Sequence, residues 1–198
     1  GTTADNNTFV GYAAGFGNNG SAHTGNNNTA IGSQAGSDIQ GAATDNTVVG
    51  FEAGKSLTTA TKNTHVGTEA GGVGVITGTR NNSFGYQAGL ALTSGTNNVF
   101  MGSLSGKAIS TGVSNTVCGE AALITEAAGD KNTAIGAEAL KAQNGGRDGN
   151  VAVGYYAGFA LTEGENNTII GTEAMSLSAI TSDKNVAVGY RAGKNLTT

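Results

Sequence analysis

The residues of this chain that could take part in acid–base or nucleophilic chemistry are few and scattered. His23 and His65 are the two histidines, and Cys118 is the one cysteine. A histidine base needs a nucleophile or an orienting carboxylate within hydrogen-bonding reach, and neither histidine has an evident partner in the sequence. We therefore expect both histidines on the surface. We interpret Cys118 as a small buried hydrophobic side chain and not as a reactive thiol.

Carboxylates recur at one position of an internal repeat, in Glu52, Glu69, Glu138 and Glu173. Like charges stacked on adjacent coils repel, so we expect these side chains to face water and not to form a catalytic pair. Residues 145–149, Gly-Gly-Arg-Asp-Gly, are similar to a calcium-binding nonapeptide. Such sites need repetition to complete the oxygen shell of the ion, and this segment occurs once. The sequence thus predicts a turn there, and it offers no catalytic residue, no metal site and no cofactor site.

The elements that position all these residues belong to one tandem repeat. Its unit is Asn-Thr-x-Val/Ile-Gly-x-x-Ala-Gly; it occurs eleven times, and after a first interval of 21 residues its period is 17 or 18. Positions are numbered here from the motif asparagine, so the fifth is Gly in every copy and the eighth is Ala in all but one. The motif asparagines are Asn7, Asn28, Asn46, Asn63, Asn81, Asn98, Asn115, Asn132, Asn150, Asn167 and Asn185.

A period of 17 or 18 is too short for two helices and a turn, and it suits one coil of a β-solenoid. The β-branched Thr-x-Val/Ile segments favour strands, while the Asn before them and the Gly after them tolerate positive φ at corners. Stacked Asn side chains can form a ladder of amides between coils. We predict an all-β fold, a parallel β-solenoid of about eleven coils that fills residues 1–198 as a single domain. A coil made of two motifs is the alternative.

The fourth motif position is apolar in every copy, and we expect its side chains to form an inward stack, the core ladder. They are Val10, Ile31, Val49, Val66, Phe84, Met101, Cys118, Ile135, Val153, Ile170 and Val188. A second apolar position, the twelfth, is occupied for example by Leu57 and Leu92 and predicts another strand on the return side of the coil. This core is thin relative to the chain entropy that it must offset. We therefore expect further copies to share the burial, in a parallel homotrimer.

The sixth position alternates between an aromatic ring and a small side chain over most of the array. The rings are Tyr12, Phe51, Tyr86, Tyr155 and Tyr190, and the small residues between them include Ser33, Thr68, Ser103 and Thr172. Steric fit is one explanation, because a ring on one coil can lie over a small residue on the next. The functional interpretation is a strip of aromatic rings that binds a glycan or a protein receptor.

Composition excludes several function classes. The net charge is −4 without a basic run, which argues against binding of nucleic acid. No stretch of about 18 apolar residues is present, so we expect no insertion into a membrane. The chain shows neither an initiator Met, nor a signal peptide, nor capping repeats. We expect it to be a segment of a longer fibre, or a unit that stacks end to end.

The unit at residues 28–36, Asn-Thr-Ala-Ile-Gly-Ser-Gln-Ala-Gly, and the Asn-Thr-Ala-Ile-Gly at residues 132–136 carry a resemblance. They resemble the head repeats of YadA-like trimeric autotransporter adhesins and, more closely, the repeat arrays of bacteriophage tail fibres. The resemblance covers nearly the whole chain. It implies a left-handed parallel β-roll assembled as a trimer, whose surface binds host matrix or receptors. The adhesin repeat is shorter, so the resemblance implies a solenoid more firmly than a particular coil shape.

We therefore expect a non-enzymatic structural fibre or adhesin segment, extracellular, on a cell surface or on a virion. Its expected partners are copies of itself, in a homotrimer or an end-to-end filament, and a host-surface glycan or protein receptor. Two alternatives remain. Val/Ile-Gly-x-x-Ala also resembles one unit of the hexapeptide repeat of left-handed β-helix acyltransferases, which need several such units per coil. An ice-binding solenoid needs a flat Thr array, and the second-position Thr column is interrupted at Asn82, Val99, Val151 and Val186.

Overall fold

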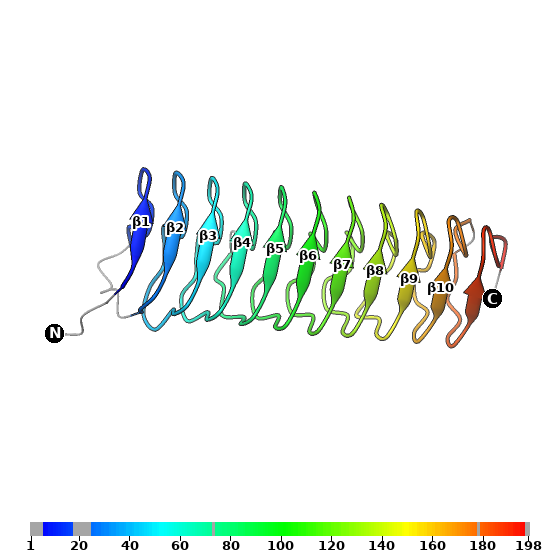
Figure 1. Cartoon of the computed structure of the whole chain (residues 1–198). Helices are drawn as coiled ribbons and strands as arrows, with labels where there is room; N and C mark the ends of the chain where they lie inside the picture. The colour runs from blue at the N-terminus through cyan, green and yellow to red at the C-terminus, as the bar shows by residue number, and fades with distance from the viewer. Residues whose placement is uncertain (1–5, 18–24, 73, 178, 197–198) are drawn as a thin grey trace.

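The structure is a computed structural model that describes residues 6–17, 25–72, 74–177 and 179–196. This part of the chain holds eleven three-residue strands and no helix, and each strand pairs only with its neighbours along the chain in one parallel sheet (Figure 1). The strands are β1 (Thr8–Val10), β2 (Thr29–Ile31), β3 (Thr47–Val49), β4 (Thr64–Val66), β5 (Asn82–Phe84), β6 (Val99–Met101), β7 (Thr116–Cys118), β8 (Thr133–Ile135), β9 (Val151–Val153), β10 (Thr168–Ile170) and β11 (Val186–Val188). The predicted all-β parallel solenoid is confirmed. Each motif makes its own coil, so the two-motif alternative is wrong.

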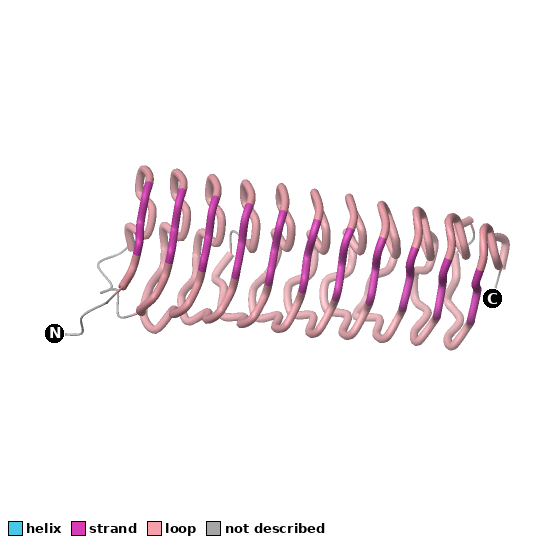
Figure 2. The backbone as a smooth tube through the Cα atoms, in the orientation of Figure 1, coloured by secondary structure: helices cyan, strands magenta, loops and turns pink. Residues whose placement is uncertain are grey.

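Neighbouring strands pair at identical motif positions, as β3 and β4 do through Thr47↔Thr64, Val48↔His65 and Val49↔Val66. Alternate residues of a strand point to opposite faces, so the second and fourth positions share one face and the third points to the other. The third position points into the coil, and its side chains are fully buried in every strand from β2 to β10. Strands occupy one side of the coil, and loops make up the rest (Figure 2).

The prediction that the fourth position forms an inward core ladder is wrong. Val10 is 56 % exposed and Met101 is 48 % exposed, and none of the eleven side chains is buried. The outward-facing residues are Val10, Ile31, Val49, Val66, Phe84, Met101, Cys118, Ile135, Val153, Ile170 and Val188. The reason is geometric. The second and fourth positions are the two ends of a three-residue strand and point outward, so only the middle residue can point into the coil. The third position fills that place, and the uniformly apolar fourth position is left on the surface.

The ninth and twelfth positions share the rest of the interior. Where the twelfth residue is Ile or Leu, the ninth is Gly: a Cβ on Gly36 would lie 2.5 Å from Cδ1 of Ile39. Where the twelfth residue is Glu126 or Gln143, the ninth is large, and Leu123 or Leu140 fills the space; all four side chains are fully buried. Each of these coils therefore has room for about one large side chain here, supplied from either position.

The return side of the coil is apolar, as expected, but the strand predicted there does not form. Its twelfth-position side chains are buried at Ile39, Leu57, Leu92, Ile109 and Leu161. Between residues 25 and 196, as far as the structure describes them, return segments pair through isolated bridges such as Leu57↔Ile76 and Leu161↔Ile180. The insertions that change the period from 17 to 18 fall on this side, where no continuous ladder fixes the register.

The corner after each strand depends on the fifth-position glycine. These eleven glycines have φ between 127° and 142°, a region that only glycine adopts readily. A Cβ on Gly85 would lie 2.6 Å from the carbonyl oxygen of Gly102 in the next coil. At the corner before the strand, the residue preceding the motif asparagine has the positive φ, for example Asp45 at 59° and Lys62 at 61°. The prediction that the motif asparagine itself takes this conformation is wrong.

The motif asparagines form the predicted ladder of side-chain amides. Nδ2 of Asn98 donates to Oδ1 of Asn81 at 3.0 Å and to the carbonyl oxygen of Gly112 at 2.7 Å. Oδ1 of Asn81 also accepts the backbone N–H of Asn98 at 3.1 Å. From Asn28 to Asn167 these side chains are fully buried. Side-chain amides thus join neighbouring coils from Asn28 to Asn115 and again from Asn150 to Asn185. Between them, Oδ1 of Asn115 accepts the backbone N–H of Asn132, and Oδ1 of Asn132 accepts that of Asn150.

Candidate functional site

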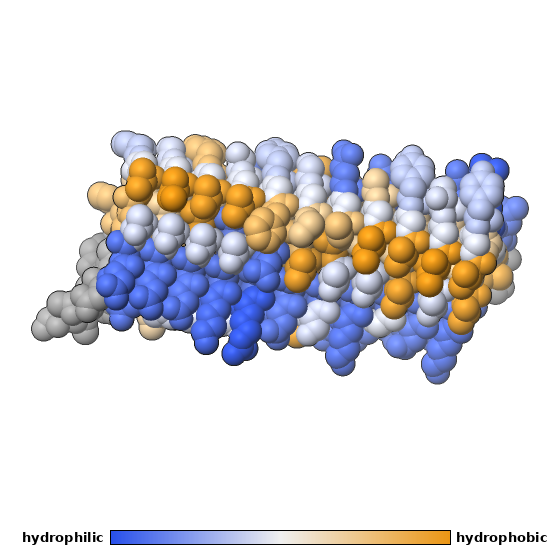
Figure 3. Space-filling model, in the orientation of Figure 1, coloured by the Kyte–Doolittle hydropathy of each residue, from blue (hydrophilic) through white to orange (hydrophobic). Residues whose placement is uncertain are grey.

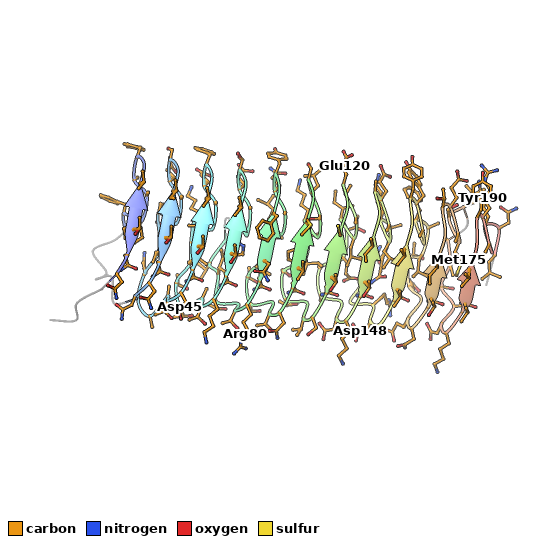
Figure 4. All side chains as sticks on the ribbon, viewed as in Figure 1. Asp45, Arg80, Glu120, Asp148, Met175 and Tyr190 are labelled. Atoms are coloured by element: carbon orange, nitrogen blue, oxygen red, sulfur yellow. The ribbon has the colours of Figure 1, made fainter. Side chains whose placement is uncertain are left out.

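One surface runs along all eleven strands: the strand face, which we define as the second- and fourth-position side chains of β1 to β11. A continuous apolar band runs along it (Figure 3). Ile31, Ile135 and Ile170 are each 39–40 % exposed, and Met101 is 48 % exposed. The second positions carry Thr, Val or Asn, so none of the 22 side chains on this face is charged. Charged residues begin at its borders, with Asp45 and Arg80 along one edge (Figure 4).

Cys118 lies within the strand face. It is a free thiol, partly exposed, in register with Met101 on β6 and Ile135 on β8. The prediction of a buried side chain is therefore wrong for the single chain, because position four faces outward. Its apolar neighbours are consistent with its interpretation as a small hydrophobic residue. Because Cys118 lies near the middle of the apolar band, a thiol reagent can label the band at this position.

The sixth-position aromatic strip lies along the border of the strand face. Its rings are all exposed: Tyr12 at 78 %, Phe51 at 45 %, Tyr86 at 50 %, Tyr155 at 52 % and Tyr190 at 67 %. Figure 4 shows Tyr190 and Glu120, both at the sixth position, on the same edge of the rod. Rings on alternate coils are separated by two strand spacings, roughly 9–10 Å. Ligand binding at this strip stays a prediction.

The seventh-position carboxylates lie beside this strip and carry polar partners. Glu52 pairs with Lys55 at 3.0 Å, and Oε2 of Glu69 accepts a hydrogen bond from Gln87 at 2.6 Å. The Arg191 guanidinium donates to Glu173 at 2.9 Å and holds the pKa of that carboxyl below its usual value. These side chains are partly exposed, which agrees with the predicted water-facing column. Their partners relieve the repulsion between stacked carboxylates.

His65 is buried, and the prediction that it lies on the surface is wrong. It occupies the third position of β4, is fully buried, and neither ring nitrogen has a hydrogen-bond partner. Burial lowers the pKa of His65 from 6.5 to about 4, so the ring is neutral at pH 7. Gly71 makes room for it, because a Cβ there would lie 2.0 Å from the ring. His23 lies outside the described residues.

Glu126 is a buried carboxylate that the sequence did not single out. Its Oε1 accepts backbone N–H groups from Ala128 at 2.9 Å, Gly129 at 3.0 Å and Gly146 at 2.9 Å. Residues 145–149, predicted as a turn, form an irregular loop, and an amide of that loop binds this carboxylate. The only sequence signal was a charged residue at a position that is otherwise mostly apolar. This arrangement joins two coils and serves the fold.

No cluster of three or more His, Cys, Asp or Glu side chains that could hold a metal ion occurs in the described part of the chain. Within the same residues, no helix is long and apolar enough to cross a membrane. The surfaces that recur along the array are the strand face and the aromatic edge beside it. Comparison of the chain with protein-family models, curated proteins and solved structures finds no match.

Proposed function

We propose that this chain is a non-enzymatic structural segment of an extracellular or virion-associated fibre, and that it associates with copies of itself through the strand face. One observation carries the proposal: every coil presents an outward apolar side chain at the fourth position and an uncharged one at the second. Monomeric soluble proteins rarely expose contiguous apolar patches of more than a few hundred Å². A band that runs the length of the sheet therefore favours coverage by another chain.

A parallel homotrimer is the assembly that we propose. Because the strands stack in constant register, parallel copies can meet coil by coil with their fourth positions at a common axis. The resemblance to trimeric adhesin heads and tail-fibre repeats supports this arrangement and a left-handed β-roll. The aromatic edge and the return side then face outward, toward a host-surface glycan or protein receptor. End-to-end stacking through β1 and β11, the outer strands of the sheet, is the second mode of self-association.

A charge placed on the strand face tests this proposal. Ile135 lies on β8 outside the buried core, so Ile135→Lys is expected to fold and to give a monomer of 19.4 kDa by light scattering. The matched control is Thr111→Lys, at an exposed loop residue away from the strand face, which is expected to keep the wild-type mass. An unchanged mass for folded Ile135→Lys contradicts association through this face.

The placement of the second-position threonines favours one second candidate. Seven of the eleven second positions are Thr, and all lie on the outward face, which is the placement an ice-binding solenoid needs. The column is interrupted at Asn82 and Val99 in the middle of the array. Thermal hysteresis separates the candidates, because the fibre proposal predicts none. In the described part of the chain no comparable observation favours an acyltransferase, since the histidine there, His65, is fully buried.

A further inference from the structure

Two surface pockets, eight coils apart, are built in the same way. The first spans the coils of β1 to β3, and the second spans those of β9 and β10. The first has a volume of about 420 Å³ and the second about 290 Å³, near the lower end of the range for small-molecule sites, roughly 300–1,000 Å³. The first pocket is lined by Tyr12, Ala13, Phe16, Gln34, Ser37 and Lys55. The second is lined by Tyr155, Tyr156, Phe159, Glu173, Ser176 and Leu177.

The shared residues occupy equivalent motif positions. In each pocket one coil supplies aromatic rings at its sixth and tenth positions, and the next coil supplies a polar seventh and a serine tenth residue. A lysine is the tenth residue of the third coil in both places, Lys55 and Lys194. This combination is specific to the two places, since the tenth residues of the coils between them are Gly72, Leu90, Lys107, Ile124 and Lys141.

A serine hydroxyl in each pocket has no partner in the protein. Ser37 and Ser176 are each 5 % exposed, and the Oγ of each lacks a hydrogen-bond partner. An unsatisfied buried hydroxyl costs about 1–3 kcal/mol. Both serines line a pocket that aromatic side chains also line, and the same unsatisfied hydroxyl occurs twice at equivalent positions. This points to a ligand that supplies the missing hydrogen bond.

Three aromatic rings that contact one another line the second pocket. The centroids of Tyr155 and Tyr156 are 4.2 Å apart, and Tyr156 stacks on Phe159 with centroids 4.7 Å apart and 19° between the planes. Its charged group, Glu173, is neutralised by Arg191 and Lys194. In the first pocket, Lys55 is likewise neutralised by Glu52. Both pockets therefore suit an uncharged ligand that has an apolar face and hydroxyl groups.

We propose that each pocket binds one neutral pyranose ring of a glycan. The C–H face of the sugar packs against the aromatic side chains of each pocket, Tyr12 and Phe16 in the first and Tyr155, Tyr156 and Phe159 in the second. A sugar hydroxyl exchanges a hydrogen bond with Oγ of Ser37 or Ser176. Gln34 in the first pocket and Glu173 in the second are the polar groups at its rim. The two pockets lie about 38 Å apart, eight strand spacings, on one chain, so a long glycan or two branches can bind both. This proposal rests on the proposed function as a receptor-binding fibre, and it names glycans as the receptor. Each pocket is nevertheless formed within one chain, so sugar binding does not require the trimer.

Saturation-transfer NMR tests this with three probes: the methyl β-glycosides of galactose, glucose and N-acetylglucosamine. At least one is expected to receive saturation at its ring C–H protons from the wild-type protein. The double variant Phe16→Leu/Phe159→Leu keeps apolar volume but removes one aromatic ring from each pocket, and it is expected to abolish the signal. The control Leu90→Ala changes the tenth residue of a coil that lines neither pocket and lies outside the aromatic strip, and it is expected to leave the signal unchanged.

The variant Ser37→Ala/Ser176→Ala removes two unsatisfied hydroxyls, so it is expected to fold at least as well as wild type and to bind about three- to tenfold more weakly. If the phenylalanine variant does not fold, this serine variant alone tests whether the pockets bind the sugar. No transfer to any of the three probes, or undiminished binding in a folded double variant, overturns the proposal. The solution mass of the protein is read separately. A trimer without glycan binding refutes this inference alone, and a glycan-binding monomer refutes the trimer alone.

Discussion

The side-chain amide of Asn98 donates to Oδ1 of Asn81 in the preceding coil at 3.0 Å, and both side chains are fully buried. The same contact joins Asn115 to Asn98 at 3.0 Å. The ladder therefore runs through the middle of the array and holds the coils in register. Asn81, Asn98 and Asn115 each need an amide, because each of these side chains donates through Nδ2 and accepts through Oδ1.

Replacing one rung by a carboxylate breaks this pattern. In Asn98→Asp the new side chain loses both amide donors and places a charge beside Oδ1 of Asn81 and the carbonyl oxygen of Gly112. We expect a loss of about 3–5 kcal/mol in unfolding free energy at pH 7, measured by urea denaturation. The matched control is Asn97→Asp, because Asn97 is the exposed neighbour and its φ of 59° suits Asp equally. Its effect is expected within about 0.5 kcal/mol, and equal effects at the two sites would contradict a buried ladder.

The buried ring of His65 makes stability depend on pH. Its folded pKa of about 4 lies below the unfolded value of 6.5, so protons bind the unfolded chain more readily. The stability is fully present above pH 6.5 and is lost as the pH falls from 6.5 toward 4, by on the order of 3 kcal/mol. Replacing the ring by Leu in His65→Leu removes this dependence and also two unsatisfied nitrogens. We expect the variant to be more stable at pH 7 by about 1–3 kcal/mol, with a larger difference at pH 4.5. Parallel stability curves for the two proteins between pH 7 and 4.5 would refute the account of His65.

The sequence correctly predicted the coil and its register, but it did not correctly predict which side chains point into the coil and which face outward. Gly85 and Asn98 recur with their equivalents in every coil, because their backbone angle and amide bonds tolerate no substitute. The inward third position holds residues as different as His65, Ser83 and Phe100, because neighbouring coils and the ninth and twelfth positions compensate for size. Variable residue types are typical of a surface position and uniformly apolar ones of a core position, so the sequence pattern favoured the fourth position as the core.

Only part of the candidate site could be predicted from the sequence. The exposed rings of the sixth position were visible as an alternation in the sequence. The pockets beside them were not, because the tenth position shows no period of its own along the array. The available signal was the series Phe16, Ser37, Lys55 and its recurrence as Phe159, Ser176, Lys194. Only the stacking of coils shows that these residues line common pockets.

A methyl group at a fifth-position glycine is expected to be strongly destabilising. Gly85 has φ of 133°, and a Cβ there would lie 2.6 Å from the carbonyl oxygen of Gly102. We expect Gly85→Ala to cost more than about 2 kcal/mol, measured as a fall in the thermal unfolding midpoint. Gly74→Ala is the control, because a Cβ on Gly74 meets only Cγ2 of Thr93 at 3.7 Å. A midpoint unaffected by Gly85→Ala would contradict the tight corner.

Labelling of Cys118 reports whether the strand face is covered in solution. In the proposed trimer the thiol lies between chains, so we expect a maleimide to react with the wild-type protein much more slowly than with Ile135→Lys. The control is a cysteine introduced as Thr111→Cys in a Cys118→Ser background, at an exposed loop residue. It should react equally fast with and without Ile135→Lys. Rapid labelling of wild-type Cys118 would mean that the face is open.

The mass of the wild-type chain in solution shows whether three chains associate through the strand face. Light scattering coupled to size-exclusion chromatography, repeated over a range of concentrations, gives this mass without reference to shape. Association of three chains through the strand face predicts three times the chain mass of 19.4 kDa. A mass of 19.4 kDa at every concentration would contradict it, because the apolar band on β1 to β11 would then face water in a stable monomer.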